Sequence, residues 1–458
     1  MTKLISTNPS RNYEVLGEVN ISSEKEIQDK VKLARSAQKN WGPIGISRRV
    51  KLLKTLVLAF AEKKEKLALL ISQEMGMPFS QAIEDLNSGI RYFSWYLDNA
   101  ETYLKPEITH EDDNEIHKVV YEPVGVVAVI VPWNFPFSNF VWQAGQNLTA
   151  GNAVVFKHSE ETPLFGREIE KVFDLSEIPR GVFNEVYGGG EVGNLLVHQD
   201  IDMICFTGSS KIGKQLYRIG AEKFIPVLME LGGSAPGIVF EDSDIDKVIE
   251  SIYINKFLNC GQVCDGLKRL IVHESKFQEV VKKLTAVIQG KRVGPAEDKN
   301  TEIGPLVAKR QLELLQEQVK DAVTKGAKII SGGKPPGNLK GAYYEPSLIV
   351  NVNRNMRIWQ EEVFGPVLPV VSFKTYEEAI ELANDTKYGL GGYVFTEDKK
   401  LFQRASSGIR TGMVAHNNVT YLMPCNPFGG CKDSGIGREH GKYGFREVCK
   451  TKTVSMEK

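Results

Sequence analysis

The 458-residue sequence lacks the features that mark several classes of protein. No window approaches the roughly 18 consecutive apolar residues of a membrane-spanning helix, and residues 1–15 have no apolar run behind Lys3. Lys plus Arg number 57, as do Asp plus Glu, so no net charge attracts nucleic acid or an anionic membrane. We therefore expect a cytoplasmic protein whose partners are small molecules, with no nucleic acid and no membrane among them.

Cysteine is also scarce. The six cysteines are scattered over the chain, and no two have the CxxC spacing of zinc sites or redox dithiols. Such a count in so long a chain is not a disulfide framework. Any cysteine chemistry is then expected from single thiols.

The sequence does contain the pattern of an α/β protein. Apolar residues recur every three or four positions from Ser23 to Tyr103, which predicts helices, and residues 106–123 then alternate as an extended arm that could pair with another subunit. Apolar runs separated by helical patterns follow at 125–132, 152–159, 181–188, 203–209 and 226–233. Buried strands alternating with helices predict a parallel sheet of the nucleotide-binding type.

A second α/β series follows Cys264. Strand patterns at 268–275, 327–333, 344–352, 367–374 and 391–396 alternate with helical patterns, so we expect two large lobes. Residues 426–444 are too rich in glycine for either regular element, and the tail at 448–458 alternates like a strand.

Cys264 is the candidate nucleophile. It lies in NCGQVCDG (259–266), where Gly261 and Gly266 bound a turn that substrate could reach and in which main-chain N–H groups could point inward. A thiolate is the strongest nucleophile among ordinary side chains. Taken alone, each of Cys260 and Cys264 is better explained as a small buried apolar residue, and the other motifs in the chain are what favour the nucleophile.

Polar residues also follow the first two strands, where open α/β sheets bind ligands. Asn134, held between two prolines in PWNFP, could donate to an oxyanion; otherwise the segment is a structural turn. Lys157 and Glu160, three residues apart, could both bind a ribose, and the carboxylate would repel a 2′-phosphate and so favour NAD over NADP. An exposed ion pair is the alternative.

Two glycine-rich loops could hold phosphates. GGGEVG (188–193) carries an acidic residue, whereas FTGSSKIG (206–213) follows a strand, opens a helix and offers free N–H groups, so we favour the second. Glu230, leaving an apolar strand into two glycines, could have a raised pKa that suits a general base. In EEVFGP (361–366), Glu362 could bind a ribose hydroxyl and Phe364 could pack on a flat cofactor.

These motifs occur in one order over roughly 300 residues: PWNFP, FKxSE, FTGSxxxG, ELGG, GQVC, EEVFGP and PFGGxKxSGxGRE. The series resembles the NAD(P)-dependent aldehyde dehydrogenase superfamily. That resemblance implies two Rossmann-like parallel-sheet lobes and a small β arm, assembled as a homodimer or homotetramer. The implied parts are a cofactor domain at 1–105 and 124–233, a catalytic domain at 234–435 and an oligomerisation arm at 106–123 and 444–458.

The resemblance also implies a role for each residue. Cys264 would attack an aldehyde, Asn134 and the Cys264 N–H would stabilise the oxyanion, and Glu230 would activate the water that hydrolyses the thioester. NAD is the implied cofactor, with NADP left open, and no metal is needed. The implied cofactor contacts are Trp133, Lys157, Glu160, Gly188, Phe206, Thr207, Gly208, Ser209, Leu231, Glu362 and Phe364.

The substrate pocket implied by the family is formed by Phe135, Trp142, Asp265 and Phe428. Succinate-semialdehyde dehydrogenases commonly carry an Arg eight residues after the motif Asn, where this chain has Trp142. Together with Asp265, this favours a neutral aliphatic or aromatic aldehyde and leaves a cationic amino-aldehyde open. Succinate semialdehyde is the alternative substrate. A non-catalytic binding protein that kept the fold and a cofactor-free esterase are the alternatives to a dehydrogenase.

Overall fold

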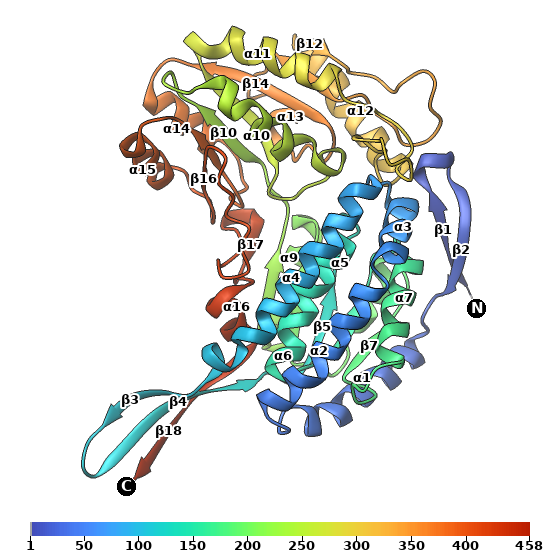
Figure 1. Cartoon of the computed structure of the whole chain (residues 1–458), viewed down its shortest axis with the longest axis vertical. Coiled ribbons are helices and arrows are strands. Elements are labelled where there is room, and N and C mark those ends of the chain that lie inside the picture. The colour runs from blue at the N-terminus through green and yellow to red at the C-terminus, as the bar shows by residue number, and fades with distance from the viewer. Residues whose placement is uncertain (1) are drawn as a thin grey trace.

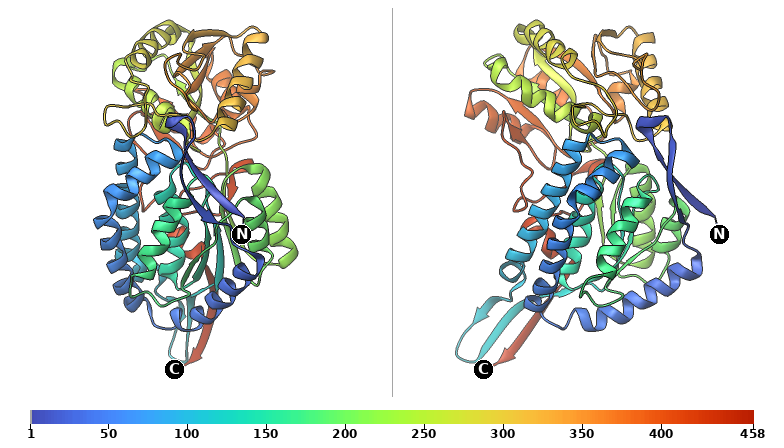
Figure 2. Two further views of the ribbon diagram at one scale, coloured as in Figure 1. Left: turned by 90° about the vertical axis from the view of Figure 1, so that its right-hand side faces the viewer. Right: turned by 45° about the vertical axis from the view of Figure 1, so that its right-hand side comes forward.

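The computed structural model describes residues 2–458 as two lobes with a narrow three-stranded extension (Figure 1). The extension projects away from both lobes in the further views, with the C-terminus at its tip (Figure 2). No helix among residues 2–458 combines the length and the apolar character needed to cross a membrane.

The predicted helical region folds as four helices. They are α1 (Glu24–Trp41), α2 (Ile46–Glu62), α3 (Lys64–Met75) and α4 (Phe79–Leu104). Ser23 caps α1 by accepting the N–H of Glu26, and Gly76 ends α3 in the left-handed conformation that favours glycine. The prediction for this segment is confirmed.

An N-terminal hairpin precedes these helices and was not predicted. Strands β1 (Lys3–Asn8) and β2 (Glu14–Asn20) pair antiparallel around a short 3₁₀ turn (Pro9–Arg11). The turn relies on Asn12 and Tyr13 at positive φ, so it lacks the Asn-Gly or Asp-Gly signal that identifies hairpins in a sequence. The hydroxyl of Ser6 donates to Glu74 on α3 at 2.6 Å and holds the hairpin against the first lobe.

The first lobe contains the predicted parallel sheet. Its parallel strands are β5 (Val126–Ile130), β6 (Ala153–Lys157), β7 (Phe183–Glu185), β8 (Met203–Thr207) and β9 (Val227–Glu230), in the order β9-β8-β5-β6-β7. Val127 and Val129 enter one apolar cluster while Val126, Ala128 and Ile130 enter another, so both faces are covered. The strand order reverses between β5 and β8, the position at which such sheets bind ligands.

Helices connect these strands. They are α5 (Pro136–Phe140) and α6 (Gln146–Ala150) on either side of a π-helical turn (Val141–Gly145), α7 (Pro163–Asp174), α8 (Gly190–Val197) and α9 (Ser210–Lys223). The π-helical turn was not predicted, and it contains Trp142.

The second lobe is built on a seven-stranded sheet. Its order is β12 (Lys328–Ser331), β13 (Ser347–Val350), β14 (Val367–Phe373), β11 (Leu267–His273), β10 (Ala235–Val239), β15 (Tyr393–Phe395) and β16 (Ala415–His416), with only β12 antiparallel to its neighbour. The helices are α10 (Ile245–Phe257), α11 (Glu274–Gln289), α12 (Lys309–Thr324), α13 (Arg357–Gln360), α14 (Tyr376–Asn384) and α15 (Lys399–Gly408). Strand β10 was missed because it starts only a few residues after β9.

The glycine-rich loop at 426–444 is more regular than predicted, so that prediction was wrong. After a 3₁₀ turn (Lys432–Ser434), strand β17 (Gly435–Ile436) pairs antiparallel with β9, and helix α16 (Gly441–Glu447) begins inside the segment. A Cβ at Gly435 would lie 2.2 Å from the Met229 carbonyl oxygen. Glycine is therefore needed here because β17 lies close to the main chain of β9, and not because the loop is flexible.

The extension is an antiparallel sheet in the order β18-β4-β3. Strands β3 (Glu107–Glu111) and β4 (Glu115–Pro123) form a hairpin, and β18 (Cys449–Glu457) pairs with β4 along its whole length. The predicted extended arm and the strand-like tail thus form one element (Figure 1).

Candidate active site

The loop that carries Cys264 is held in an unusual conformation. After α10 the backbone passes through positive φ at Asn259, Cys260 and Gly261. A Cβ at Gly261 would lie 2.3 Å from the Gly365 carbonyl oxygen, and one at Gly233 would lie 2.3 Å from that of Cys264. Glycine is therefore required on both sides. Cys264 is partly exposed, whereas Cys260 is buried in the apolar core of the second lobe.

Asn134 is tied to this loop by two hydrogen bonds, and a third bond comes from α5. The Nδ2 of Asn134 donates to the Gln262 carbonyl at 3.0 Å. The side chain of Asn259 donates to the main-chain carbonyl of Asn134 at 2.7 Å. A third bond, from Asn139 to Asn134 Oδ1 at 3.3 Å, fixes the orientation of the amide. One N–H of the amide is used in this way, and the second is free to donate to a bound oxygen atom.

Residues of five sequence motifs line one cavity of 270 Å³. It opens between the lobes, so that β5, β8 and β9 contribute through the residues that follow them and the second lobe contributes through Cys264 and the 361–366 loop. The lining residues are Pro132, Trp133, Asn134, Thr207, Gly208, Ser209, Leu231, Gly232, Cys264, Gln311, Leu314, Glu362 and Phe364.

The geometry of this cavity suits a flat ring attached to a ribose. Trp133 and Phe364 meet edge to face with their ring centroids 5.6 Å apart. Glu362 accepts the N–H of Gly233 at 3.1 Å, and a Cβ at Gly232 would come within 2.4 Å of that carboxylate. The absence of a Cβ at Gly232 and Gly233 lets the Glu362 carboxylate and the Cys264 main chain lie close to them. The carboxylate and the two rings fit the nicotinamide end of a dinucleotide.

The other predicted cofactor residues lie at the same sheet edge, outside this cavity. Lys157 ends β6 and is 3% exposed, with Nζ 3.7 Å from the Glu160 carboxylate; burial lowers the pKa of Lys157. Gly188 follows β7 and packs against Val192, and Phe206 lies beneath Gly208. Ser209, which does line the cavity, caps α9 through the Ile212 N–H, so the helix-cap alternative is present in the structure.

Charge at the site opposes ionisation of both candidate catalytic groups. Burial, followed by the Asp265 carboxylate, raises the pKa of the Cys264 thiol. Burial, followed by Glu439, raises the pKa of Glu230, whose two carboxyl oxygens have no hydrogen-bond partner among the described residues. Both groups therefore hold their protons more tightly than usual, and a proton must leave each before it can act.

Lys268 is a functional candidate that the sequence analysis missed. It is 1% exposed, donates to the Gly261 carbonyl at 3.3 Å and lies over the Phe364 ring with Nζ 4.6 Å from the centroid. Its positive charge lowers the pKa of the Cys264 thiol, whereas the nearby carboxyl groups raise it. Its position four residues after the candidate nucleophile, on β11, was the only signal in the sequence.

The predicted substrate residues fall into three environments. Trp142 and Phe428 meet with their ring centroids 5.4 Å apart, beside an apolar cluster on which Cys264 also packs. Asp265 lines a separate cavity behind the Cys264 loop. Phe135 packs against the core of the first lobe.

Residues 2–454 match the model of the aldehyde dehydrogenase family. The chain belongs to this family. It is therefore an oxidoreductase that acts on aldehydes with a nicotinamide cofactor, as the sequence predicted, and its two lobes with an antiparallel extension are the aldehyde dehydrogenase fold.

Relatives in the family cover nearly the whole chain. The peroxisomal aminoaldehyde dehydrogenase 1 of Pisum sativum is 37% identical over 99% of this chain and 92% of that protein. The mitochondrial succinate-semialdehyde dehydrogenase of Oryza sativa subsp. japonica is 35% identical over 97% of this chain and 84% of its own length. An NAD⁺ complex of an aldehyde dehydrogenase from Bacillus cereus superposes with a TM-score of 0.96 at 33% identity, covering 100% of this chain and 93% of that one.

Proposed function

We propose that this aldehyde dehydrogenase oxidises its substrate through a covalent intermediate on Cys264, with Asn134 as the oxyanion donor and Glu230 as the general base. The observation that carries the proposal is that Cys264, Asn134 and Glu362 line one cavity although they lie far apart in the sequence. In this reading residues 1–105 with 124–233 form the cofactor domain and residues 234–435 the catalytic domain.

The chemistry follows from these positions. The deprotonated sulfur of Cys264 adds to the carbonyl carbon, and the oxygen that becomes negative accepts hydrogen bonds from the free Asn134 N–H and the Cys264 main chain. When NAD is bound, its nicotinamide accepts the hydride that leaves this carbon. Glu230 then takes a proton from water, whose oxygen attacks the resulting thioester, and the acid departs as the sulfur regains a proton.

We assign Lys157 and Glu160 to the adenosine ribose, and Glu362 with Phe364 to the nicotinamide side. The 3.7 Å separation between Lys157 Nζ and the Glu160 carboxylate supports the first assignment, because both groups can then reach the two hydroxyls of one ribose. Ser209 is assigned to a phosphate through the N-terminus of α9. The Glu160 charge gives the preference for NAD over NADP.

We propose a homodimer or homotetramer assembled through the β18-β4-β3 extension. Its two outer strands, β18 and β3, have unpaired edges and carry the exposed apolar residues Ile108, Val454 and Met456. A strand edge with apolar side chains favours pairing with a second chain. The balanced charge and six free cysteines support the cytoplasm as its location.

The substrate should be an aldehyde without an anionic group. The site places Trp142 and Asp265 near the nucleophile, and neither carries a positive charge that could pair with a carboxylate. The aminoaldehyde and succinate-semialdehyde dehydrogenases among the relatives show that the family accommodates both charge types, so the choice depends on this chain's own residues.

Initial-rate formation of NADH at 340 nm tests the proposal. The purified protein is assayed with hexanal, benzaldehyde, 4-aminobutanal and succinate semialdehyde, with and without NAD. Strict dependence on NAD and slow turnover of succinate semialdehyde are expected. Ester hydrolysis without NADH formation would replace the dehydrogenase by an esterase, and fast turnover of succinate semialdehyde would mean that an unassigned basic group reaches the site.

A further inference from the structure

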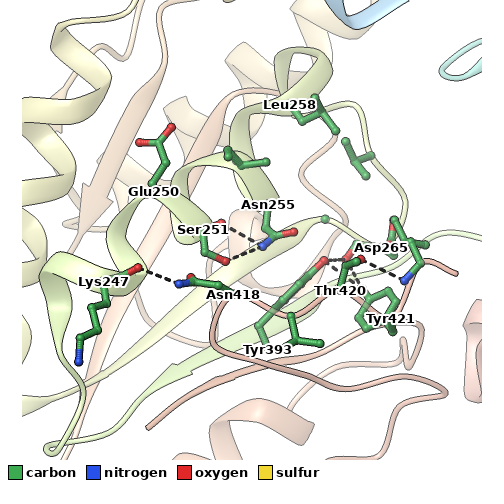
Figure 3. Close-up of a pocket in the computed structure, with 15 residues that line it drawn as sticks. Lys247, Glu250, Ser251, Asn255, Leu258, Asp265, Tyr393, Asn418, Thr420 and Tyr421 are labelled. Carbon is green, nitrogen blue, oxygen red and sulfur yellow. Dashed lines mark hydrogen bonds between the residues drawn. The ribbon is translucent and has the colours of Figure 1, made fainter. Parts of the chain in front are cut away.

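A second cavity, of 440 Å³, lies on the other side of the Cys264 loop. It is formed by α10, by the two residues that flank Cys264 and by the segment 418–422. Figure 3 shows Asp265, Tyr393 and Tyr421 together at one end, with Lys247 and Glu250 at the other. The cavity therefore extends from the immediate neighbour of the nucleophile to the surface of α10.

Asp265 is the charged group at the inner end. The residue is 5% exposed, and its Oδ1 lies 3.9 Å from Cys264 Sγ. The carboxylate forms no ion pair with any residue that the structure describes. Burial raises the pKa of Asp265, whereas the Tyr421 hydroxyl and, more weakly, the Lys268 ammonium group favour its ionised form. A ligand cation at this end of the cavity would stabilise the carboxylate further.

The two tyrosines fix Asp265 in place. Tyr393 donates to the Asp265 main-chain carbonyl at 3.1 Å, Tyr421 donates to the same oxygen at 3.4 Å, and the two hydroxyls are 3.0 Å apart. A buried carboxylate that is held rigidly beside aromatic rings is a suitable binding site for an organic cation.

The outer end of the cavity has no cation in its lining that lacks an acidic partner. Lys247 is the one cationic side chain in the lining, and its ammonium group is paired with Asp244 at 3.1 Å. Glu250 adds a second carboxylate to the wall. The charges at both ends therefore favour a cationic ligand over an anionic or a neutral one.

We infer that this cavity binds the tail of a substrate aldehyde that carries an ammonium or quaternary ammonium group close to the carbonyl, with Asp265 as the specificity-determining residue. The inference rests on the proposed function. The sequence analysis favoured a neutral aldehyde and left a cationic amino-aldehyde open, and the cavity favours the cationic one.

The same arrangement links binding to reactivity. The Asp265 carboxylate opposes formation of the Cys264 thiolate, and the positive charge of a bound substrate offsets that repulsion. A cationic aldehyde therefore favours ionisation of the sulfur that attacks it, which a neutral aldehyde of the same shape does not.

A pair of isosteric aldehydes tests the inference. Trimethylammonioacetaldehyde and 3,3-dimethylbutanal differ in charge and share a shape, and kcat/KM is measured for both with the wild type and with Asp265→Asn. We expect the wild type to prefer the cation at least tenfold, and the variant to lose at least tenfold for the cation and less than threefold for the neutral aldehyde. Since each aldehyde hydrates to the same extent in both assays, hydration cancels from the change in this ratio.

Binding without turnover separates this inference from the proposed function. Choline and 3,3-dimethylbutan-1-ol form the corresponding pair of unreactive alcohols, and calorimetric titration should detect choline binding to the wild type at least tenfold more tightly than to Asp265→Asn. If choline binds in this way but neither aldehyde yields NADH, the proposed function fails and the cation site stands. Wild-type kcat/KM values that are equal for the two aldehydes, or a ratio that Asp265→Asn leaves unchanged, would overturn the inference.

Discussion

The two sides of the Cys264 loop are built in different ways. On the side of the 270 Å³ cavity, the lining comes from short motifs with fixed spacing, and glycines bring main chain close to the ligand position. On the side of the 440 Å³ cavity, the two neighbours of Cys264 are joined by residues of α10 and of the segment 418–422, which belong to no motif. The chemistry of the reaction is thus encoded in local sequence, whereas the choice of substrate depends on residues that only the fold brings together.

Cys264 lines the 270 Å³ cavity, and its two neighbours line the 440 Å³ cavity, so the loss of its sulfur should have the largest effect. Cys264→Ala removes the sulfur that forms the intermediate, and we expect kcat to fall at least ~10³-fold for every aldehyde. The control is Cys425→Ala, an exposed cysteine, which should keep the wild-type rate. NADH formation in excess of a few per cent of wild type in Cys264→Ala would place the nucleophile elsewhere.

Asn134 tests the side that faces the cofactor. Asn134→Ala removes the proposed oxyanion donor and should lower kcat/KM by about 10²-fold, close to ~3 kcal/mol of transition-state stabilisation. The loss should be similar for cationic and neutral aldehydes, in contrast to Asp265→Asn. Because the Asn134 side chain also donates to the Gln262 carbonyl, circular dichroism must first show that the variant is folded.

Asn139→Ala is the matched control for this variant. It removes only the 3.3 Å bond that orients the Asn134 amide, so its effect on kcat/KM should be smaller than that of Asn134→Ala. Equal losses in the two variants would indicate that the segment as a whole had moved, and they would not support an oxyanion donor.

The same contrast explains what could be predicted from the sequence. The strands β5, β6, β8 and β9 were predicted because each is an apolar run followed by turn residues. The residues that follow β5, β8 and β9 lie together in the 270 Å³ cavity, because parallel strands end at one edge of a sheet. The hairpin β1–β2 and strand β17 were missed because their pairing is fixed by tertiary contacts and positive φ rather than by a local pattern.

The residues on the substrate side of the loop show more clearly what could not be predicted from the sequence. Asp265 was singled out because it follows the nucleophile, but nothing in the sequence relates it to Tyr393 or Tyr421, which lie more than a hundred positions away and donate to its carbonyl. Lys268 was missed for the same reason: β11 is buried from Leu267 to Val272, and the sequence does not reveal that a lysine within it points into the protein. Both cases depend on long-range packing.

Glu160 should affect the choice of cofactor and leave the choice of aldehyde unchanged. Glu160→Ser removes the charge that would repel a 2′-phosphate, and we expect the ratio of kcat/KM for NAD to that for NADP to fall about tenfold. The control is Glu161→Gln, since the neighbouring Glu161 pairs with Arg310 instead, and it should leave the ratio near wild type. An unchanged ratio in Glu160→Ser would refute our account of cofactor preference.

The smallest expected effect is a shift in the pH profile. The pKa of Glu230 is raised first by burial and then by Glu439, and further by Asp265 and Glu447, whereas Arg438 lowers it. Burial also raises the pKa of Glu439, to about 8. Glu230 can accept a proton only when ionised, so thioester hydrolysis is lost as the pH falls through its raised pKa. Glu439→Gln removes one opposing charge and should move the acidic limb of the kcat profile to lower pH, by about one unit.

Two further variants show which side of the loop controls this ionisation. Glu447→Gln should move the same limb less than Glu439→Gln, because Glu447 contributes least among the groups named. Asp265→Asn should also move it to lower pH, since the Asp265 carboxylate acts on Glu230 from the substrate side. With a cationic aldehyde as substrate that second shift should shrink, because the bound charge already offsets Asp265. A limb that stays in place in Glu439→Gln, or moves to higher pH, would mean that Glu230 is not the base whose ionisation the profile reports.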